Sequence, residues 1–183
     1  MINSLISALL IFFLSPLFIV VAVIIFFDDG FPVIFRQKRI GKNNIFFTLY
    51  KFRTMKKNIS DIPTHLLDNK KNIYTKTGLF FRKYSIDELP QLFNIFKGEM
   101  NFIGPRPALH NQEDLIELRI KKNVSQLKPG ITGWAQINGR DNLSIKKKVD
   151  LDFYYYKSKC FKLNLKIIFF TLLKVIKSEG VQK

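Results

Sequence analysis

The sequence has a single cysteine, Cys160, in 183 residues, so it cannot form an internal disulfide, and a reduced, cytoplasmic compartment is expected. Acidic residues are also few, because 14 Asp and Glu stand against 30 Lys and Arg, which gives a formal net charge of +16. Such a chain should bind anionic partners: nucleic acid, an anionic membrane surface or a phosphorylated small molecule. The basic residues are dispersed, with neither zinc-ligand spacing nor an RNP-like run, which argues against nucleic acid.

The N-terminal region lacks basic residues altogether, since no Lys or Arg occurs before Arg36. Residues 5–27 form an uncharged run of 23 residues, long enough for a helix across a hydrocarbon core of about 30 Å. A cleaved signal peptide would have a basic start, a shorter apolar run and a small-residue cleavage site, and none of these is present. Basic residues from Arg36 to Lys42 follow the run, so the rest of the chain is expected on the cytoplasmic side.

The pair Ser15-Pro16 interrupts this apolar run near its midpoint. Pro16 has no N–H to donate to the carbonyl of Phe12, so the helix should bend or break there, and the Ser15 hydroxyl could bond a freed carbonyl. Two geometries follow. The residues alone favour a kinked helix that spans the bilayer over a re-entrant helix that returns to the same leaflet.

The remainder has room for one modest domain in which strands and helices are mixed. Turn-forming residues flank a short alternating strand at 33–35, and the aromatic and β-branched residues of 45–53 predict a second strand, which suggests a hairpin. Residues 56–78 are polar and predict a surface loop. Residues 150–177 predict a helix that lysines interrupt too often for a membrane span. Its apolar side could face either a membrane interface or the core.

Two adjacent carboxylates occur in the stretch YSIDELPQ, at Asp87 and Glu88. Ser85 and Glu88 match a capping box, but a helix capped by Ser85 would lose a hydrogen bond at Pro90. Asp87 is therefore the better N-cap for a helix that ends at Gly98. A positive helix end favours the ionised form of an acidic pair, which a nucleophile or a ligand of Mg²⁺ requires. By itself the pair is a weak signal, because acidic residues at a helix start are common helix electrostatics.

Three motifs occur in order along the chain: KFRTM at 51–55, FRKYSIDELPQLFNIFKGEMNFIGPRP at 81–107 and KPGITGWAQINGR at 128–140. Together they closely resemble the bacterial sugar transferase family, whose members are monotopic phosphoglycosyl transferases, and the chain resembles the small form. The resemblance implies an α+β fold in which residues 1–27 form a re-entrant membrane helix broken at Ser15-Pro16. Residues 28–183 would then form one compact cytoplasmic catalytic domain with small β-hairpin elements and an interfacial C-terminal helix, at the bacterial inner membrane.

The resemblance also implies an activity: transfer of a phospho-sugar from a UDP-sugar to a polyprenyl phosphate, with release of UMP, at the start of glycoconjugate synthesis. Asp87 would attack the phosphate nearest the sugar and form a covalent aspartyl intermediate. Glu88 would bind metal or handle a proton, and Mg²⁺ is the expected cofactor, held by both carboxylates. Membrane lipids and downstream glycosyltransferases are the other expected partners, and nucleic acid is not one.

Substrate-binding roles are expected for residues of the same motifs, namely Arg82, Arg106, Arg140, Gly104, Pro105 and Gly130. An arginine on a rigid turn can bind a phosphate with two parallel bonds, and glycines let the backbone approach a nucleotide closely. Two other classes share the charge and the apolar start: a membrane-tethered nucleic-acid-binding protein and a non-enzymatic membrane scaffold. The residues do not distinguish one sugar donor from another.

Overall fold

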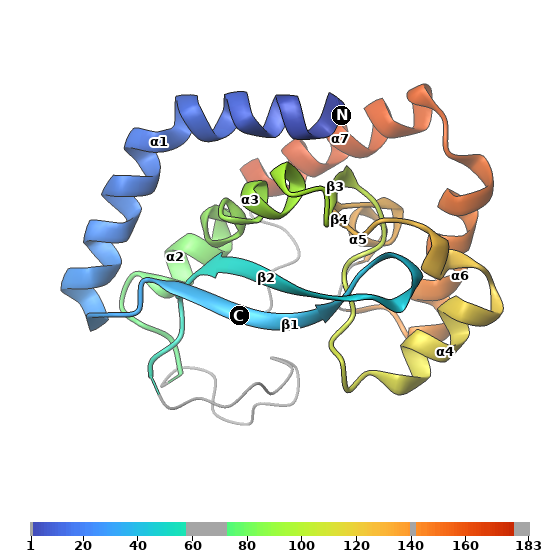
Figure 1. Ribbon diagram of the computed structural model, residues 1–183, viewed down its shortest axis with the longest axis horizontal. Helices are drawn as coiled ribbons and strands as arrows, with labels where there is room; N and C mark the ends of the chain where they lie inside the picture. The colour runs from blue at the N-terminus through green and yellow to red at the C-terminus, as the bar shows by residue number, and fades with distance from the viewer. Residues whose placement is uncertain (1, 58–72, 140–141, 178–183) are drawn as a thin grey trace.

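The computed structural model describes residues 2–57, 73–139 and 142–177, and it combines helices with two small two-stranded sheets, which confirms the predicted α+β fold (Figure 1). In chain order the elements are α1 (Ile2–Asp29), β1 (Ile34–Ile40), η1 (Lys42–Asn44), β2 (Phe46–Phe52), α2 (Gly78–Lys83), η4 (Ile86–Glu88), α3 (Gln91–Phe96), β3 (Asn101–Ile103), α4 (Glu113–Lys121), η5 (Val124–Gln126), β4 (Gly130–Thr132), α5 (Trp134–Ile137), α6 (Ile145–Ser158) and α7 (Phe161–Lys177). Most of the predicted loop at 56–78 lies outside the described residues.

Helix α1 bends in the middle, so that its first half runs along the top of the molecule in Figure 1 and its second half descends toward the hairpin. The Ser15 hydroxyl donates to the Phe12 carbonyl at 2.8 Å, which satisfies the acceptor that Pro16 cannot serve. The predicted bend and its repair are therefore confirmed. The helix continues to Asp29, just beyond the predicted end at residue 27, and is long and apolar enough to cross a membrane by length and composition.

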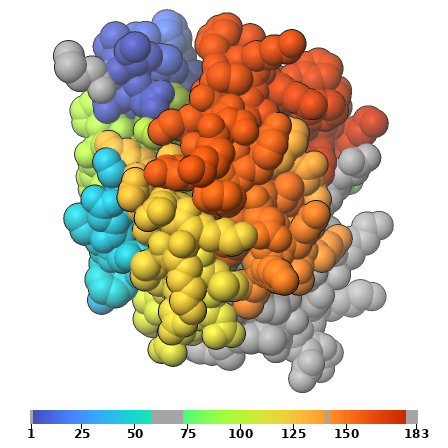
Figure 2. Space-filling view, turned by 90° about the vertical axis from the view of Figure 1, so that its right-hand side faces the viewer, coloured from blue at the N-terminus to red at the C-terminus, as the bar shows by residue number. Residues whose placement is uncertain are grey.

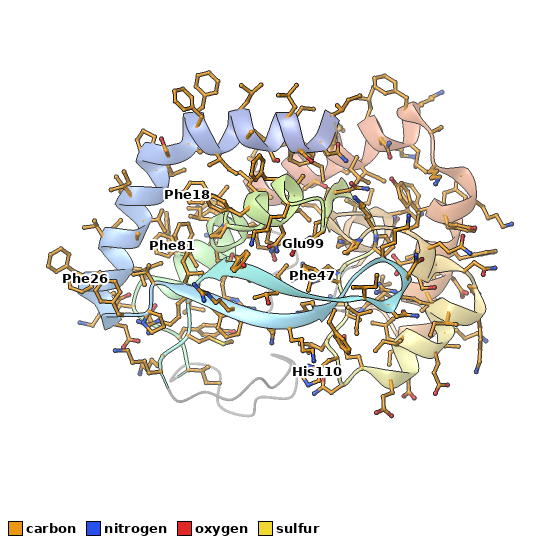
Figure 3. All side chains as sticks on the ribbon, in the orientation of Figure 1. Phe18, Phe26, Phe47, Phe81, Glu99 and His110 are labelled. Carbon is orange, nitrogen blue, oxygen red and sulfur yellow. The ribbon has the colours of Figure 1, made fainter. Side chains whose placement is uncertain are left out.

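The inner side of α1 is part of the protein core. Figure 3 shows Phe18 inside the bend, where its ring centroid lies 5.6 Å from that of Phe52 and 5.7 Å from that of Phe93. Val21 and Ile25 are buried in one hydrophobic cluster with Phe52. The outer side is exposed and apolar, with Leu5, Leu9, Phe12, Phe13, Leu17, Ile19, Val20, Val23 and Phe27. One helix therefore serves two environments.

Strands β1 and β2 form the predicted hairpin, antiparallel from Ile34↔Phe52 to Ile40↔Phe46. The first strand is longer than the predicted 33–35, because cross-strand pairing continues through the polar residues that follow it. A second, parallel pair joins β3 to β4, with Asn101 beside Gly130. This pairing brings the motif at 81–107 against the motif at 128–140, so the two motifs form one structural unit.

The C-terminal region forms two helices, α6 and α7, so the prediction of one helix over 150–177 is wrong in this respect. On α7, Leu163 and Ile167 are buried. The apolar residues that define the other side, Phe161, Leu165, Ile168, Phe169, Leu172 and Ile176, are all exposed, so they do not face the core. Figure 2 shows α7 and the start of α1 at the same end of the molecule. The first half of α1 and α7 thus have their exposed apolar residues at the same end of the protein.

Candidate active site

The acidic pair lies in its own short turn, η4, and not at the start of a helix. Ser85 precedes this turn with a left-handed φ of 56° and makes no side-chain cap bond. Helix α3 begins only at Gln91, directly after Pro90, whose missing N–H costs nothing there. The prediction of Asp87 as the N-cap of that helix is therefore wrong, whereas rejection of the Ser85 cap is confirmed. The helix stops as expected, with Gly98 at a φ of 77°.

Both carboxylates are buried and lie against cations from two other segments. Lys51, on β2, places its Nζ 2.7 Å from Glu88 Oε1 and 3.7 Å from Asp87 Oδ2. Arg106, on the turn that follows β3, places Nη2 3.1 Å from the same Glu88 oxygen. Asp87 and Glu88 are only 5% and 7% exposed. Two acids and two bases from three distant segments thus form one ionic cluster, called the dyad cluster below.

Burial sets the protonation of this cluster. It raises the pKa of Asp87 above its ordinary value, a shift that the charge of Lys51 opposes and that of Glu88 reinforces. Burial likewise lowers the pKa of Lys51, while Glu88 and Asp87 favour its charged form. Burial therefore disfavours the charged forms of Asp87 and Lys51, while the opposite charges beside them favour those forms.

The other predicted residues are placed as follows. Arg106 contacts Glu88 of the dyad directly. The positive charge of Arg82 opposes the rise that burial causes in the pKa of Asp87, and the Arg82 guanidinium lies 5.2 Å from the Tyr74 ring centroid. Pro105 accepts a hydrogen bond from the Gly130 N–H through its carbonyl, at 2.9 Å. Arg140 lies outside the described residues.

Close backbone packing requires glycine at positions 104 and 130, whether or not a nucleotide contacts them. A Cβ on Gly104 would lie 2.4 Å from the Lys128 carbonyl oxygen, and one on Gly130 would lie 2.1 Å from the Gly104 nitrogen. Because both contacts are with backbone, a side chain at either position would push the two motifs apart. Their role in substrate binding stays a prediction.

The chain matches the model of a family described as "Bacterial sugar transferase" over residues 1–178. The chain belongs to the bacterial sugar transferase family. Three relatives illustrate its range. The transferase is 48% identical over 156 residues to the uncharacterized sugar transferase EpsL of Bacillus subtilis, with 84% of this chain and 75% of that protein covered.

Two further relatives have names that state an activity. One is the undecaprenyl-phosphate glucose phosphotransferase of Komagataeibacter xylinus, 40% identical, with 95% of this chain and 35% of that protein covered. The other is the UDP-N-acetylgalactosamine-undecaprenyl-phosphate N-acetylgalactosaminephosphotransferase of Aeromonas hydrophila, 36% identical, with 92% and 41% covered. The transferase thus spans less than half the length of these two relatives, and they differ in their sugar.

Sequence reasoning missed a buried amide, Asn94, that joins β2 of the transferase to α3. The Asn94 Nδ2 donates to the Thr48 carbonyl at 2.7 Å and to Glu99 Oε2 at 2.6 Å, while its Oδ1 accepts from the Tyr50 N–H at 3.1 Å. Figure 3 shows Glu99 between α3 and the hairpin. These bonds fix β2 to α3, and hence Lys51 to the turn that carries the acids.

Lys51 was also missed, although KFRTM was recognised as a motif. The available signal was a lysine inside an aromatic, β-branched strand, where a charge is costly without a partner. Nothing in the sequence identified which acid that partner would be.

The dyad fits a shared magnesium ion better than a metal site made by protein alone. Among the described residues, no group of three or more His, Cys, Asp and Glu could hold a metal. Mg²⁺ commonly binds through one or two carboxylates and takes the rest of its ligands from water and substrate phosphates. Asp87 and Glu88 provide that donor set.

Proposed function

We propose that this transferase moves a sugar 1-phosphate from a UDP-sugar to a polyprenyl phosphate and releases UMP. The names of two relatives indicate undecaprenyl phosphate as the acceptor. The observation that carries the proposal is the dyad cluster, in which Lys51 and Arg106 lie against two buried acids. A diphosphate donor needs cations to bind, and a covalent route needs an ionised nucleophile beside them. The dyad cluster provides two cations, and Asp87 beside them is the proposed nucleophile.

In the first step, an Asp87 carboxylate oxygen attacks the phosphorus nearest the sugar. A bond forms between this oxygen and phosphorus, the bond from phosphorus to the bridging oxygen breaks, and UMP leaves with the electron pair. In the second step, an oxygen of the lipid phosphate attacks the same phosphorus and Asp87 leaves as a carboxylate. The product is a polyprenyl diphosphate sugar, and the enzyme is regenerated without net proton transfer.

The cations make two successive attacks by anions on a phosphate feasible. Lys51 and Arg106 both contact Glu88, so Glu88 orients the positive charges toward the diphosphate. Arg82 adds positive charge near Asp87. Asp87 and Glu88 would hold Mg²⁺ together with the donor phosphates, and the ion, when bound, would offset negative charge on the diphosphate.

The lipid acceptor requires that the active site lie at a membrane. We infer that the exposed apolar sides of α1 and α7 enter one leaflet, with residues 1–27 re-entrant and residues 28–183 on the cytoplasmic face of the inner membrane. Support comes from the bend at Pro16, from exposed phenylalanines on α7 and from lysines that border them.

The experiment is a single-turnover reaction without lipid acceptor. The detergent-solubilised enzyme is mixed with Mg²⁺ and each of a panel of UDP-sugars, and UMP release and intact protein mass are measured. With the correct donor, the enzyme should release UMP and gain the mass of one phosphosugar. Asp87→Asn should abolish both, because a neutral amide is a poor nucleophile, whereas Asp114→Asn, an exposed acid on α4, should change neither.

Other outcomes assign other roles. If UMP appears only when polyprenyl phosphate is added and no adduct forms, the lipid phosphate attacks directly and Asp87 is a metal ligand. If no donor gives UMP even with the lipid, the transferase proposal fails. Salt-dependent retention of RNA or DNA would then favour the nucleic-acid-binding class, and its absence the scaffold class.

A further inference from the structure

Arg106 is held from two sides. Its guanidinium contacts Glu88 in the dyad cluster, while its backbone carbonyl accepts a hydrogen bond from Arg119 Nη1 at 2.9 Å. Arg119 lies on α4, directs its hydrogen bonds to the Arg106 carbonyl and to Asp152 and not to the two acids of the dyad, and is 8% exposed. A side chain outside the dyad cluster thus fixes the backbone from which a cluster residue extends.

Arg119 is itself anchored by a buried acid on α6. Its Nε and Nη2 lie 3.1 Å and 2.6 Å from Asp152 Oδ2, and Asp152 is 2% exposed. Burial raises the pKa of Asp152, and the Arg119 charge opposes that shift. The rigid fork of the guanidinium therefore has a defined direction, with two donors toward the carboxylate and one toward the turn.

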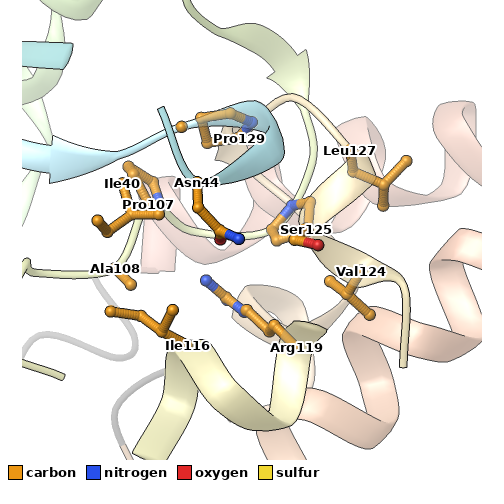
Figure 4. A pocket seen from close by; sticks show the side chains of 12 residues that line it. Ile40, Asn44, Pro107, Ala108, Ile116, Arg119, Val124, Ser125, Leu127 and Pro129 are labelled. Atoms are coloured by element: carbon orange, nitrogen blue, oxygen red, sulfur yellow. The ribbon is translucent and has the colours of Figure 1, made fainter. Parts of the chain in front are cut away.

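Two features make the Arg119 bond important to this turn. Arg106 stands between Pro105 and Pro107, which lack an N–H and bond only through their carbonyls, to Gly130 and Arg39, so the Arg119 bond is the one that holds the backbone at Arg106 itself. Figure 4 shows the second feature, a pocket behind the turn that is lined by both prolines, Ile116 and Arg119 and by none of the four dyad-cluster residues. A shorter side chain at Arg119 would leave the turn room to move toward that pocket.

We propose that Arg119 and Asp152 are positioning residues for the transfer reaction, because they hold the Arg106 guanidinium on Glu88 and on the donor diphosphate. The inference rests on the proposed function for the identity of the donor. The competing explanation is that the pair only joins α4 to α6. The chain contains a matched control for it, because Lys122 and Asp150 form an ion pair between the same two helices at the surface.

The test is a double-mutant cycle on UMP release by the full chain. Arg119→Gln should lower kcat/KM for the UDP-sugar about 10- to 100-fold, as misplacement of a site group typically does. In an Arg106→Ala background, Arg119→Gln should cost no further activity, because the group that it positions is gone. Lys122→Gln should leave kcat/KM unchanged, and thermal unfolding should check that each variant is folded.

A loss from Arg119→Gln that is equally large with and without Arg106, or one that Lys122→Gln reproduces, would overturn the proposal. Should Arg119→Gln fail to fold, Asp152→Asn, which keeps the side-chain volume, replaces it in the same cycle. If the wild-type enzyme releases UMP but the cycle shows no coupling, only the positioning inference fails. If the wild-type enzyme releases no UMP with any donor, the proposed function fails, and the same cycle measured on UDP binding by calorimetry decides the positioning inference separately.

Discussion

Replacement of Lys51 by methionine removes the buried cation of the dyad cluster while retaining most of its volume. Lys51 Nζ lies 3.7 Å from Asp87 Oδ2, and two unit charges at that separation interact by about 4 kcal/mol at an effective dielectric constant of about 20. Loss of one partner from a buried ion pair typically costs about 3–5 kcal/mol. Because about 1.4 kcal/mol is a factor of ten, adduct formation at neutral pH should fall about 100- to 4,000-fold.

The pH dependence separates this electrostatic role from packing. Asp87 reacts only when ionised, so the rate rises as the pH rises through its pKa, and loss of the Lys51 charge moves this limb to higher pH. The wild-type rate should fall again at high pH as Lys51, whose pKa burial lowers, loses its proton. Lys51→Met should therefore regain part of its activity at alkaline pH and lack the descending limb.

The assay is the initial rate of phosphosugar adduct formation, measured by intact mass between about pH 5 and 10. Lys42→Met, at an exposed lysine in the hairpin turn, is the matched control and should follow the wild-type profile. Lys51→Arg keeps a charge that is not lost at alkaline pH, so it should keep the ascending limb at a lower rate and lack the descending limb. A Lys51→Met loss that is the same at every pH would refute the electrostatic reasoning.

Three further predictions follow from the fold and the site. Leucine at both Ser15 and Pro16 should straighten α1 and favour a span, so that a tag before Met1, inaccessible to impermeant reagents in intact wild-type cells, becomes accessible; external labelling of the wild-type tag would contradict re-entrance. Asn94→Leu leaves the Tyr50 N–H and the Thr48 carbonyl without the Asn94 amide, so the free energy of unfolding, measured with denaturant in detergent, should fall by at least about 2 kcal/mol. An unchanged denaturation midpoint would show that Asn94 does not join β2 to α3 as described. Removal of Mg²⁺ with a chelator should stop both UMP release and adduct formation, and an undiminished rate would exclude a divalent cation from the reaction.

Local chemistry allowed correct predictions where one segment determines the outcome. The bend at Pro16 and its repair by Ser15 follow from a missing N–H and a hydroxyl within one helical turn. The hairpin follows from aromatic and β-branched residues on either side of turn formers. The start of α3 was misplaced because Pro90 suits the position just before a helix as well as a place within its first turn.

Contacts between distant segments could not be predicted in this way. Lys51 lies 36 positions before Asp87 in the chain, and only the fold places it at 3.7 Å from that acid. Asn94 has the same character, since an asparagine in a short helix looks like a surface residue until β2 is seen beside it. The Arg119 and Asp152 pair resembles ordinary helix charges until both prove to be buried.

The double role of α1 limits how the enzyme can be produced. Deletion of an apolar N-terminal helix is a common way to obtain a soluble fragment, but here Val21 and Ile25 form one wall of a cluster that includes Phe52 and Phe81. A fragment that begins after Gly30 would expose those aromatic rings to water and should aggregate. Detergent micelles or lipid nanodiscs that cover only the outer side of α1 are therefore the appropriate environment for assays and crystallisation.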